Sequence, residues 1–344
     1  MPPFLLSLYH KRAPLSRGIC HIGGDPIDLI IIPGFQNETG PARLLKIREA
    51  APRLDLHYID RKSVTAAMLR DCEVLYGNPP PELLAEAPNL KWHHLPSAGI
   101  EPYGDLTLYA NRSVTLTNAS GVYGAAIAEH VLGLALAMLR QLPYYVRQQA
   151  GGGWKRHPHM LELSGSSVLI CGMGDLGRKA AEKFRVMGCR VLGVRKLFHD
   201  IPPGFADVYN LRHLDEAVRE ADIVVSCLPD THETRGVFNS VIFENMRPSA
   251  LFINVGRGSA VIEDDLAAAL QNGVIAGAAL DVFAEEPLPP DNPLRFMENV
   301  LITPHCSGAS PLTHDRNYEL FFDLLTRYAA KKRLYNIVDF FAGY

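Results

Sequence analysis

The sequence predicts an α/β protein made of two doubly wound parallel-sheet domains. Short apolar runs alternate with segments of helical spacing in two series, one before and one after residue 120. A glycine-rich turn at residues 171–177 joins an apolar run directly to a helical segment. Strands that alternate with helices form parallel sheets, because each crossover helix returns the chain to the same end of the sheet.

The first series contains five expected strands. They are the apolar runs DLIIIPG, LDLHYID, EVLYGN, LKWHHLP and SVTLTN, which begin at residues 28, 54, 73, 90 and 113. Helical spacing and a proline or polar start predict helices in residues 41–51, 64–72 and 81–87. A single long helix is expected from about residue 124 to residue 149, ended by three glycines at 151–153.

The second series contains six expected strands. They are SVLIC, CRVLGV, DIVVSCL, ALFINV, IAGAALDV and NVLITP, which begin at residues 167, 189, 222, 250, 275 and 299. Apolar residues at helical spacing predict a helix over 176–187, and six strands with helices between them make a complete nucleotide-binding domain. A last amphipathic helix, residues 311–334, lies outside this count and is expected to return to the first domain.

Composition excludes several classes of protein. The formal charge of −3 and the lack of long basic runs argue against nucleic-acid binding. The most apolar stretch begins at Val131 and is closed by Arg140, so it is too short to span a bilayer. The six cysteines have neither paired nor metal-like spacing, which predicts reduced thiols, a cytoplasmic location and no metal site.

The turn CGMGDLG has the spacing of a dinucleotide-binding loop. Gly172, Gly174 and Gly177 form G-x-G-x-x-G between an expected strand and an expected helix. Such glycines let the backbone approach a pyrophosphate, which the helix amino terminus then faces. The intervening Asp175 and Leu176 are predicted to contact the cofactor as well. The alternative is a plain tight turn between strand and helix.

The next strand ends on positive charge. An NAD site usually carries an acid about 20 residues after the glycines, where it binds the ribose 2′-hydroxyl. Here the position 18 residues after Gly177 (195 − 177) is Arg195, followed by Lys196. Guanidinium and ammonium groups attract a 2′-phosphate, which predicts NADP as the preferred cofactor. In the alternative, these are solvated charges at a strand end and the protein uses NAD.

Three later stretches follow expected strands. NVGRG carries Arg257, LDVFAEEP carries Asp281 and Glu286, and ITPHCSG carries His305. In a doubly wound sheet the ligand crevice lies beyond the carboxyl ends of the strands. An arginine, an acid and a histidine at that edge could bind an anion, orient an imidazole and move a proton.

These motifs together resemble the D-2-hydroxyacid dehydrogenase family. The resemblance covers roughly residues 28–344 and is carried by AIAEHVLGLALAMLR, Trp154, CGMGDLG, INVGRG, ALDVFAEEPLP and ITPH. It implies a Rossmann domain at 121–305, inserted into a flavodoxin-like substrate domain made of residues 26–120 and 306–344. Residues 1–25 are expected to be an amino-terminal extension, whose order the sequence does not indicate.

The resemblance also implies roles for individual residues. Arg257 matches the arginine that binds the substrate carboxylate, His305 the acid/base, and Glu286 the carboxylate paired with that histidine. A neighbouring carboxylate favours the charged imidazolium, which supplies the proton. The backbone amides of Ala98 and Gly99 match those that hold the substrate carboxylate. Further cofactor contacts are implied at Cys227, Pro229, Thr234, Val255, Gly256, Asp281 and Ser307.

The predicted function is reduction of a small 2-oxo acid, such as glyoxylate or hydroxypyruvate, to the D-2-hydroxy acid by NADPH. Glu286 argues against formate, because the similar formate dehydrogenases have glutamine there. One alternative is an NAD-dependent enzyme similar to phosphoglycerate dehydrogenase. The other is a nucleotide-sensing binding protein similar to the C-terminal-binding protein corepressors. The family buries the region of the long helix between subunits, so a homodimer is expected.

Overall fold

The computed structural model describes residues 27–32, 41–51, 53–196 and 200–343, and it divides into two compact units. One unit runs up to Ala119 and resumes at His314, and the other is Ser120–Thr313. The chain therefore returns to the first unit eight residues after the expected position (314 − 306). The predicted extension, residues 1–25, lies outside the described residues.

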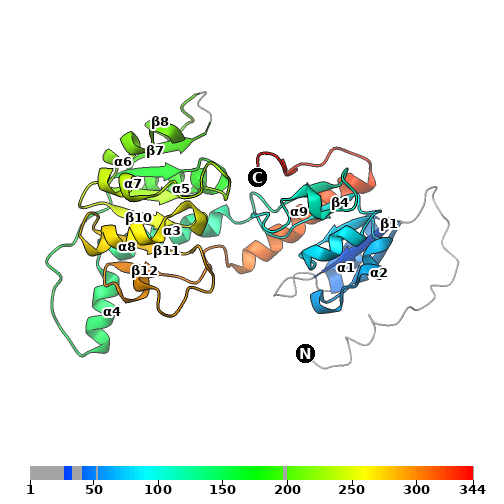
Figure 1. Cartoon of the computed structure of the whole chain (residues 1–344), viewed down its shortest axis with the longest axis horizontal. Helices are drawn as coiled ribbons and strands as arrows, with labels where there is room; N and C mark the ends of the chain where they lie inside the picture. The colour runs from blue at the N-terminus through cyan, green and yellow to red at the C-terminus, as the bar shows by residue number, and fades with distance from the viewer. Residues whose placement is uncertain (1–26, 33–40, 52, 197–199, 344) are drawn as a thin grey trace. The chain divides into compact units, whose positions relative to one another are not determined.

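Seven parallel strands form the sheet of the second unit, in the order β12-β11-β10-β9-β6-β7-β8 (Figure 1). The strands are β6 (Ser167–Cys171), β7 (Arg190–Arg195), β8 (Asp207–Asn210), β9 (Ile223–Ser226), β10 (Leu251–Asn254), β11 (Gly277–Leu280) and β12 (Val300–Ile302). The expectation of six strands was wrong by one, because β8 was missed. This four-residue strand lies at the sheet edge and reads DVYN, so half of its residues are polar and its apolar pattern is weak.

Helices cover both faces of this sheet. On one face α3 (Gly124–Leu139) and α5 (Asp175–Val186) pack through residues such as Val131 and Phe184. On the other face α6 (Leu214–Arg219), α7 (Ser240–Asn245) and α8 (Glu263–Gln271) pack through Val218, Phe243 and Leu266. Both faces of a parallel sheet must be buried, which explains why its strands read as continuous apolar runs.

The expected single helix over residues 124–149 is two helices. α3 ends at Leu139, α4 (Leu142–Ala150) follows, and the axes bend by 67°. Gln141 has φ of 55°, in the left-handed region, and Pro143 lies in the first turn of α4. Proline lacks the N–H that a continuous helix needs, so the break falls at this point. No single described helix is long and apolar enough to cross a membrane, although the bent α3–α4 pair meets that test by length and composition.

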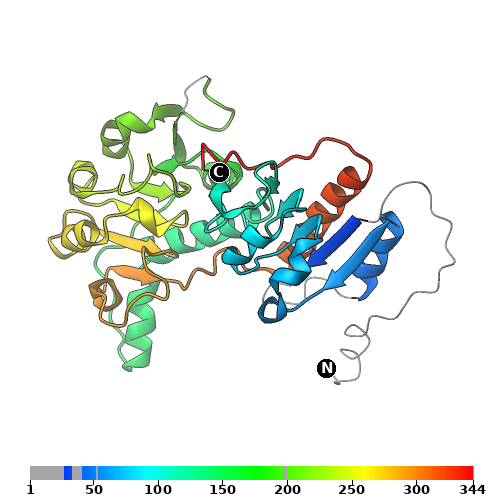
Figure 2. The same ribbon diagram turned by 45° about the vertical axis from the view of Figure 1, so that its right-hand side comes forward.

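Five parallel strands form the sheet of the first unit, in the order β2-β1-β3-β4-β5. They are β1 (Ile27–Ile31), β2 (Leu54–Tyr58), β3 (Val74–Tyr76), β4 (Trp92–His94) and β5 (Thr115–Thr117). This is the flavodoxin-like order. The helices of this unit are α1 (Pro41–Ala50), α2 (Ala66–Arg70) and α9 (Pro311–Ala329), and residues 81–86 form a 3-10 helix. Figure 2 shows α9, in orange-red, beside the blue strand β1, and Phe321 and Leu324 of α9 share a core with Leu29.

Candidate active site

The predicted catalytic residues follow three adjacent strands. β10, β11 and β12 are parallel neighbours that end at Asn254, Leu280 and Ile302. Carboxyl ends of parallel strands meet at one edge of a sheet, so the segments that follow these strands share that edge.

His305 and Glu286 form a close polar pair at this edge. Nδ1 of His305 lies 2.6 Å from Oε2 of Glu286, and Oε1 of Glu286 accepts a bond from the Phe283 amide at 2.9 Å. The histidine side chain is 53% exposed, and its Nε2 has no hydrogen-bond partner in the part of the chain that the structure describes. The arrangement fixes one ring nitrogen and leaves the other accessible for proton transfer.

Asp281 is fully buried and holds the segment around His305, residues 303–307. Asp281 accepts bonds from the Thr303 hydroxyl at 2.6 Å and from the Cys306 and Ser307 amides at 3.0 and 3.1 Å. Burial opposes ionisation, but the donors from Ser307 and Thr303 outweigh it and lower the pKa of Asp281.

The backbone of His305 is held in an uncommon conformation. Its amide donates to the Asp281 carbonyl at 2.8 Å, and its φ is 48°, in the left-handed region that non-glycine residues seldom adopt. Strained backbone of this kind persists only where surrounding contacts determine it. Here the hydrogen bonds that Asp281 accepts from His305 and its neighbours hold the turn.

His130 was not assigned a role from the sequence. Its Nε2 lies 3.1 Å from Oγ1 of Thr303 and 3.8 Å from Oδ1 of Asp281. α3 thereby contacts the segment that carries His305. Helical spacing places His130 on a helix but does not indicate its partner, which follows β12 more than 170 residues later.

Arg257 lies in a tight turn after β10. Asn254 fixes this turn, since its Nδ2 donates to the Arg257 carbonyl at 3.0 Å and its Oδ1 accepts from the Gly256 amide at 3.2 Å. A Cβ added to Gly258 would come within 1.8 Å of the Phe283 backbone. The turn that carries Arg257 therefore packs directly on the segment whose amide holds Glu286.

The glycine-rich turn leaves room for a ligand at the start of α5. Gly172 has φ of 100°, and a Cβ there would lie 2.7 Å from the Cys227 carbonyl oxygen; a Cβ on Gly177 would lie 1.9 Å from the Gly172 carbonyl oxygen. In contrast, a Cβ on Gly174, the N-cap of α5, would meet nothing within 4 Å. Two glycines thus permit close packing and the third faces open space, as a pyrophosphate cradle requires.

The loops after β9 and β10 and the first turn of α5 contain several more of the predicted cofactor contacts. The hydroxyl of Thr234 donates to the Pro229 carbonyl at 2.6 Å and accepts from the Thr231 amide at 2.9 Å, so it folds the loop after β9 onto itself. The Val255 amide donates to the Ser226 carbonyl at 3.1 Å, next to Cys227. Asp175 forms an ion pair with Lys179 at 2.8 Å. Leu176 packs at the edge of the α3–α5 core.

A hollow of about 860 Å³ lies beside the end of β7. Lys196 lines it and pairs with Glu233 at 2.9 Å, while Arg195 is the last residue of β7. The full lining is Lys196, Asn210, Leu211, Arg212, His213, His232, Glu233 and Val237. The sequence did not indicate Arg212, His213 or His232, because they follow β8 and β9 and fall outside the glycine motif.

Ala98 and Gly99 belong to the first unit, in the loop after β4. Carbonyl oxygens hold this loop: that of Ala98 accepts from Asn118 Nδ2 at 2.8 Å, and that of Gly99 from the Ser97 hydroxyl at 2.7 Å. Among the described residues, the amides of Ala98 and Gly99 donate no hydrogen bond. Two amides are thus available to an anion.

Comparison with known proteins identifies the family of this chain. Residues 132–307 match the family model of the D-isomer specific 2-hydroxyacid dehydrogenase NAD binding domain. A glyoxylate reductase of Aeropyrum pernix is 34% identical over 270 residues, which cover 75% of this chain and 79% of that protein.

Two solved structures share the fold. A D-isomer specific 2-hydroxyacid dehydrogenase family protein from Aeromonas salmonicida superposes with a TM-score of 0.80 at 34% identity, covering 92% of this chain and all of that one. An NADPH-dependent glyoxylate/hydroxypyruvate reductase from Sinorhizobium meliloti, in complex with NADP and sulfate, gives a TM-score of 0.77 at 30% identity with the same coverage. The chain therefore belongs to the D-isomer specific 2-hydroxyacid dehydrogenases, NAD(P)-dependent oxidoreductases that act on CH–OH groups.

Proposed function

We propose that this enzyme reduces a small 2-oxo acid, of the size of glyoxylate or hydroxypyruvate, to the D-2-hydroxy acid with NADPH. The observation that carries the proposal is the His305–Glu286 pair, at the sheet edge that Arg257 also borders. The names of the relatives and structural neighbours support the substrate class.

Each residue of this edge has a distinct task in the proposal. Arg257 binds the substrate carboxylate, since a guanidinium presents two parallel donors. His305 donates a proton from Nε2 to the carbonyl oxygen, while Glu286 holds Nδ1 and stabilises the charged ring. Asp281 keeps the segment around His305 in place through the Cys306 and Ser307 amides, and its carboxylate is also proposed to contact the cofactor.

The cofactor would be held by the glycine cradle and the loops around it. Gly172, Gly174 and Gly177 would hold the pyrophosphate, and Arg195 and Lys196 the 2′-phosphate. When bound, the reduced nicotinamide supplies the hydride. The basic groups that line the hollow beside β7, Arg212 among them, support NADPH over NADH.

A substrate panel with both cofactors tests the proposal. We expect NADPH to be preferred by at least about tenfold in kcat/KM, since each charge-assisted bond to the phosphate contributes about 1.5–3 kcal/mol. The 2-oxo acids should be reduced and neutral ketones of the same size should not. Arg257→Lys should lose most activity on 2-oxo acids, because an ammonium group cannot replace the paired donors. Equal rates on a ketone and a 2-oxo acid would overturn the assignment.

We further propose a homodimer in the cytoplasm. Apolar side chains on and after α4 are exposed, with Val146 at 65% and Trp154 at 100%. Burial of such residues against a second copy would remove apolar surface from water. Sedimentation equilibrium at micromolar concentration tests this, and Val146→Glu should shift the protein toward monomer. The cysteines in the described ranges are free thiols, which fits a reducing compartment.

A further inference from the structure

The hollow beside β7 contains an acid as well as its basic groups. Lys196 Nζ and Glu233 Oε2 are 2.9 Å apart, and their side chains are 53% and 52% exposed. Asn210 Nδ2 donates to the Lys196 carbonyl at 2.6 Å and so fixes the backbone from which the lysine extends. The ammonium group therefore has an anionic partner from within the chain.

We propose that Glu233 is a specificity-determining residue, whose carboxylate competes with the cofactor's 2′-phosphate for Lys196 and so limits the preference for NADPH over NADH. The inference rests on the proposed use of NADPH. A phosphate that approaches Lys196 must displace Glu233 or lie beside it, and either arrangement costs free energy through lost pairing or like-charge repulsion. The 2′-hydroxyl of NADH is neutral, so Glu233 imposes neither cost on it.

The charges around the hollow support this reading. Glu233 is the one acid among the described residues that line the hollow, and Lys196 and Arg212 are cations that line it as well. A second acid, Glu216, pairs with His213 at 3.2 Å and does not line the hollow. Loss of the Glu233 charge therefore leaves a lining with no opposing carboxylate.

The affinities of two cofactor fragments test this proposal without measuring enzyme turnover. Adenosine 2′,5′-bisphosphate carries the 2′-phosphate and adenosine 5′-monophosphate lacks it, and calorimetry gives the Kd of each. Glu233→Gln should tighten binding of the bisphosphate by about two- to fivefold, the upper part of the range typical of exposed charge pairs. The monophosphate should change by less than about twofold, and added salt should shrink the difference.

A matched control removes the same charge elsewhere. Asp215, on α6, pairs with Arg219 at 3.7 Å and does not line the hollow. Asp215→Asn should leave both affinities near those of the parent. In a Lys196→Gln background the effect of Glu233→Gln should shrink, because the competition requires the lysine.

The outcomes distinguish a failure of the NADPH assignment from a failure of the inference about Glu233. If the parent binds both fragments equally, the NADPH assignment fails and this inference fails with it. If the parent prefers the bisphosphate but Glu233→Gln leaves that preference unchanged or weakens it, the inference alone is overturned. An equal gain for both fragments also overturns it, because Glu233 would then act on the common adenosine 5′-phosphate.

Discussion

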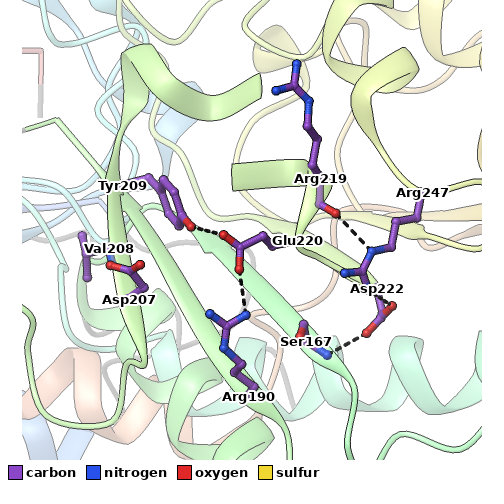
Figure 3. Close-up of polar contacts among 9 residues, drawn as sticks. All are labelled: Ser167, Arg190, Asp207, Val208, Tyr209, Arg219, Glu220, Asp222 and Arg247. Atoms are coloured by element: carbon purple, nitrogen blue, oxygen red, sulfur yellow. Dashed lines mark hydrogen bonds and ion pairs between the residues drawn. The ribbon is translucent and has the colours of Figure 1, made fainter. Parts of the chain in front are cut away.

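In the seven-stranded sheet, charged side chains gather both at the amino ends and at the carboxyl ends of the parallel strands. Their hydrogen bonding differs between these two ends of the sheet. At the amino end Glu220 pairs with Arg190 at 2.9 Å and accepts the Tyr209 hydroxyl, while Asp222 pairs with Arg247 at 2.5 Å (Figure 3). At the carboxyl end, the described residues bond only one ring nitrogen of His305, and its side chain is half exposed.

The difference separates groups that hold the chain together from groups available to a ligand. In the amino-end network, the second oxygen of Asp222 accepts from the Ser167 amide at 2.8 Å, and Arg247 also donates to the Arg219 carbonyl at 3.1 Å (Figure 3). Its donors and acceptors therefore satisfy one another. At the carboxyl end, Asp281 accepts from the Cys306 amide and fixes the backbone beside His305, while the Phe283 amide holds Glu286. Among the described residues, Nε2 of His305 has no hydrogen-bond partner. Substitutions in the amino-end network should therefore change stability, and substitution of His305 at the carboxyl end should change activity.

The largest expected effect is the loss of the proton donor. His305→Ala should lower kcat for 2-oxo acid reduction by about 10²–10⁴-fold with the free energy of unfolding little changed, because a general acid contributes about that much. Steady-state kinetics and urea unfolding of the same preparation measure both quantities. Glu286→Gln keeps a hydrogen-bond acceptor but removes the charge, so it should lose less activity than His305→Ala. Full activity in His305→Ala would abolish the distinction between the two ends.

Asp281→Asn should affect stability and activity together, since its contacts position His305. Its buried carboxylate accepts from three donors, so the free energy of unfolding should fall by about 3 kcal/mol at pH 7. The folded-state pKa is lowered, so the carboxylate stabilises the protein above its unfolded pKa of about 4. That stabilisation is lost as pH falls through the folded pKa.

The pH dependence of the free energy of unfolding tests the prediction for Asp281→Asn. Urea unfolding at pH 7 and at successively lower pH should show the difference between parent and Asp281→Asn shrinking below about pH 4. Asp215→Asn, at an exposed ion pair, serves as the control and should change the free energy of unfolding by less than about 1 kcal/mol. A difference that stays constant with pH would mean that the charge of Asp281 is not what stabilises the segment.

The smallest expected effect lies at the amino end. The hydrogen bond to Glu220 raises the pKa of Tyr209 to about 12, so the tyrosine is a neutral donor at physiological pH. Tyr209→Phe should lower the free energy of unfolding by about 1 kcal/mol, the usual contribution of one hydrogen bond. Activity should not change, and thermal unfolding together with kcat/KM checks both. A tenfold loss of kcat/KM would show that the two ends are coupled.

The positions of the strand ends could be read from the sequence because apolar runs and turn residues encode local structure. The runs before Gly172, Arg257 and His305 correspond to β6, β10 and β12. Since parallel strands of one sheet all end at one edge, this local information was sufficient to place Gly172, Arg257 and His305 at the same edge of the seven-stranded sheet. The break between α3 and α4 was also encoded locally, by Pro143, but the apolar pattern continues across it and suggested a single helix.

Only the tertiary structure decided which side chains meet. His130 contacts Thr303, Lys196 pairs with Glu233, and Gly258 packs on Phe283, and each pair joins segments far apart in the chain. Helical or strand spacing specifies which face of an element a residue occupies, and the partner depends on how the elements pack. For the same reason the sequence indicated positive charge at Arg195 and Lys196 but not the acid opposite, because Glu233 reaches Lys196 only when the loop after β9 folds beside the end of β7.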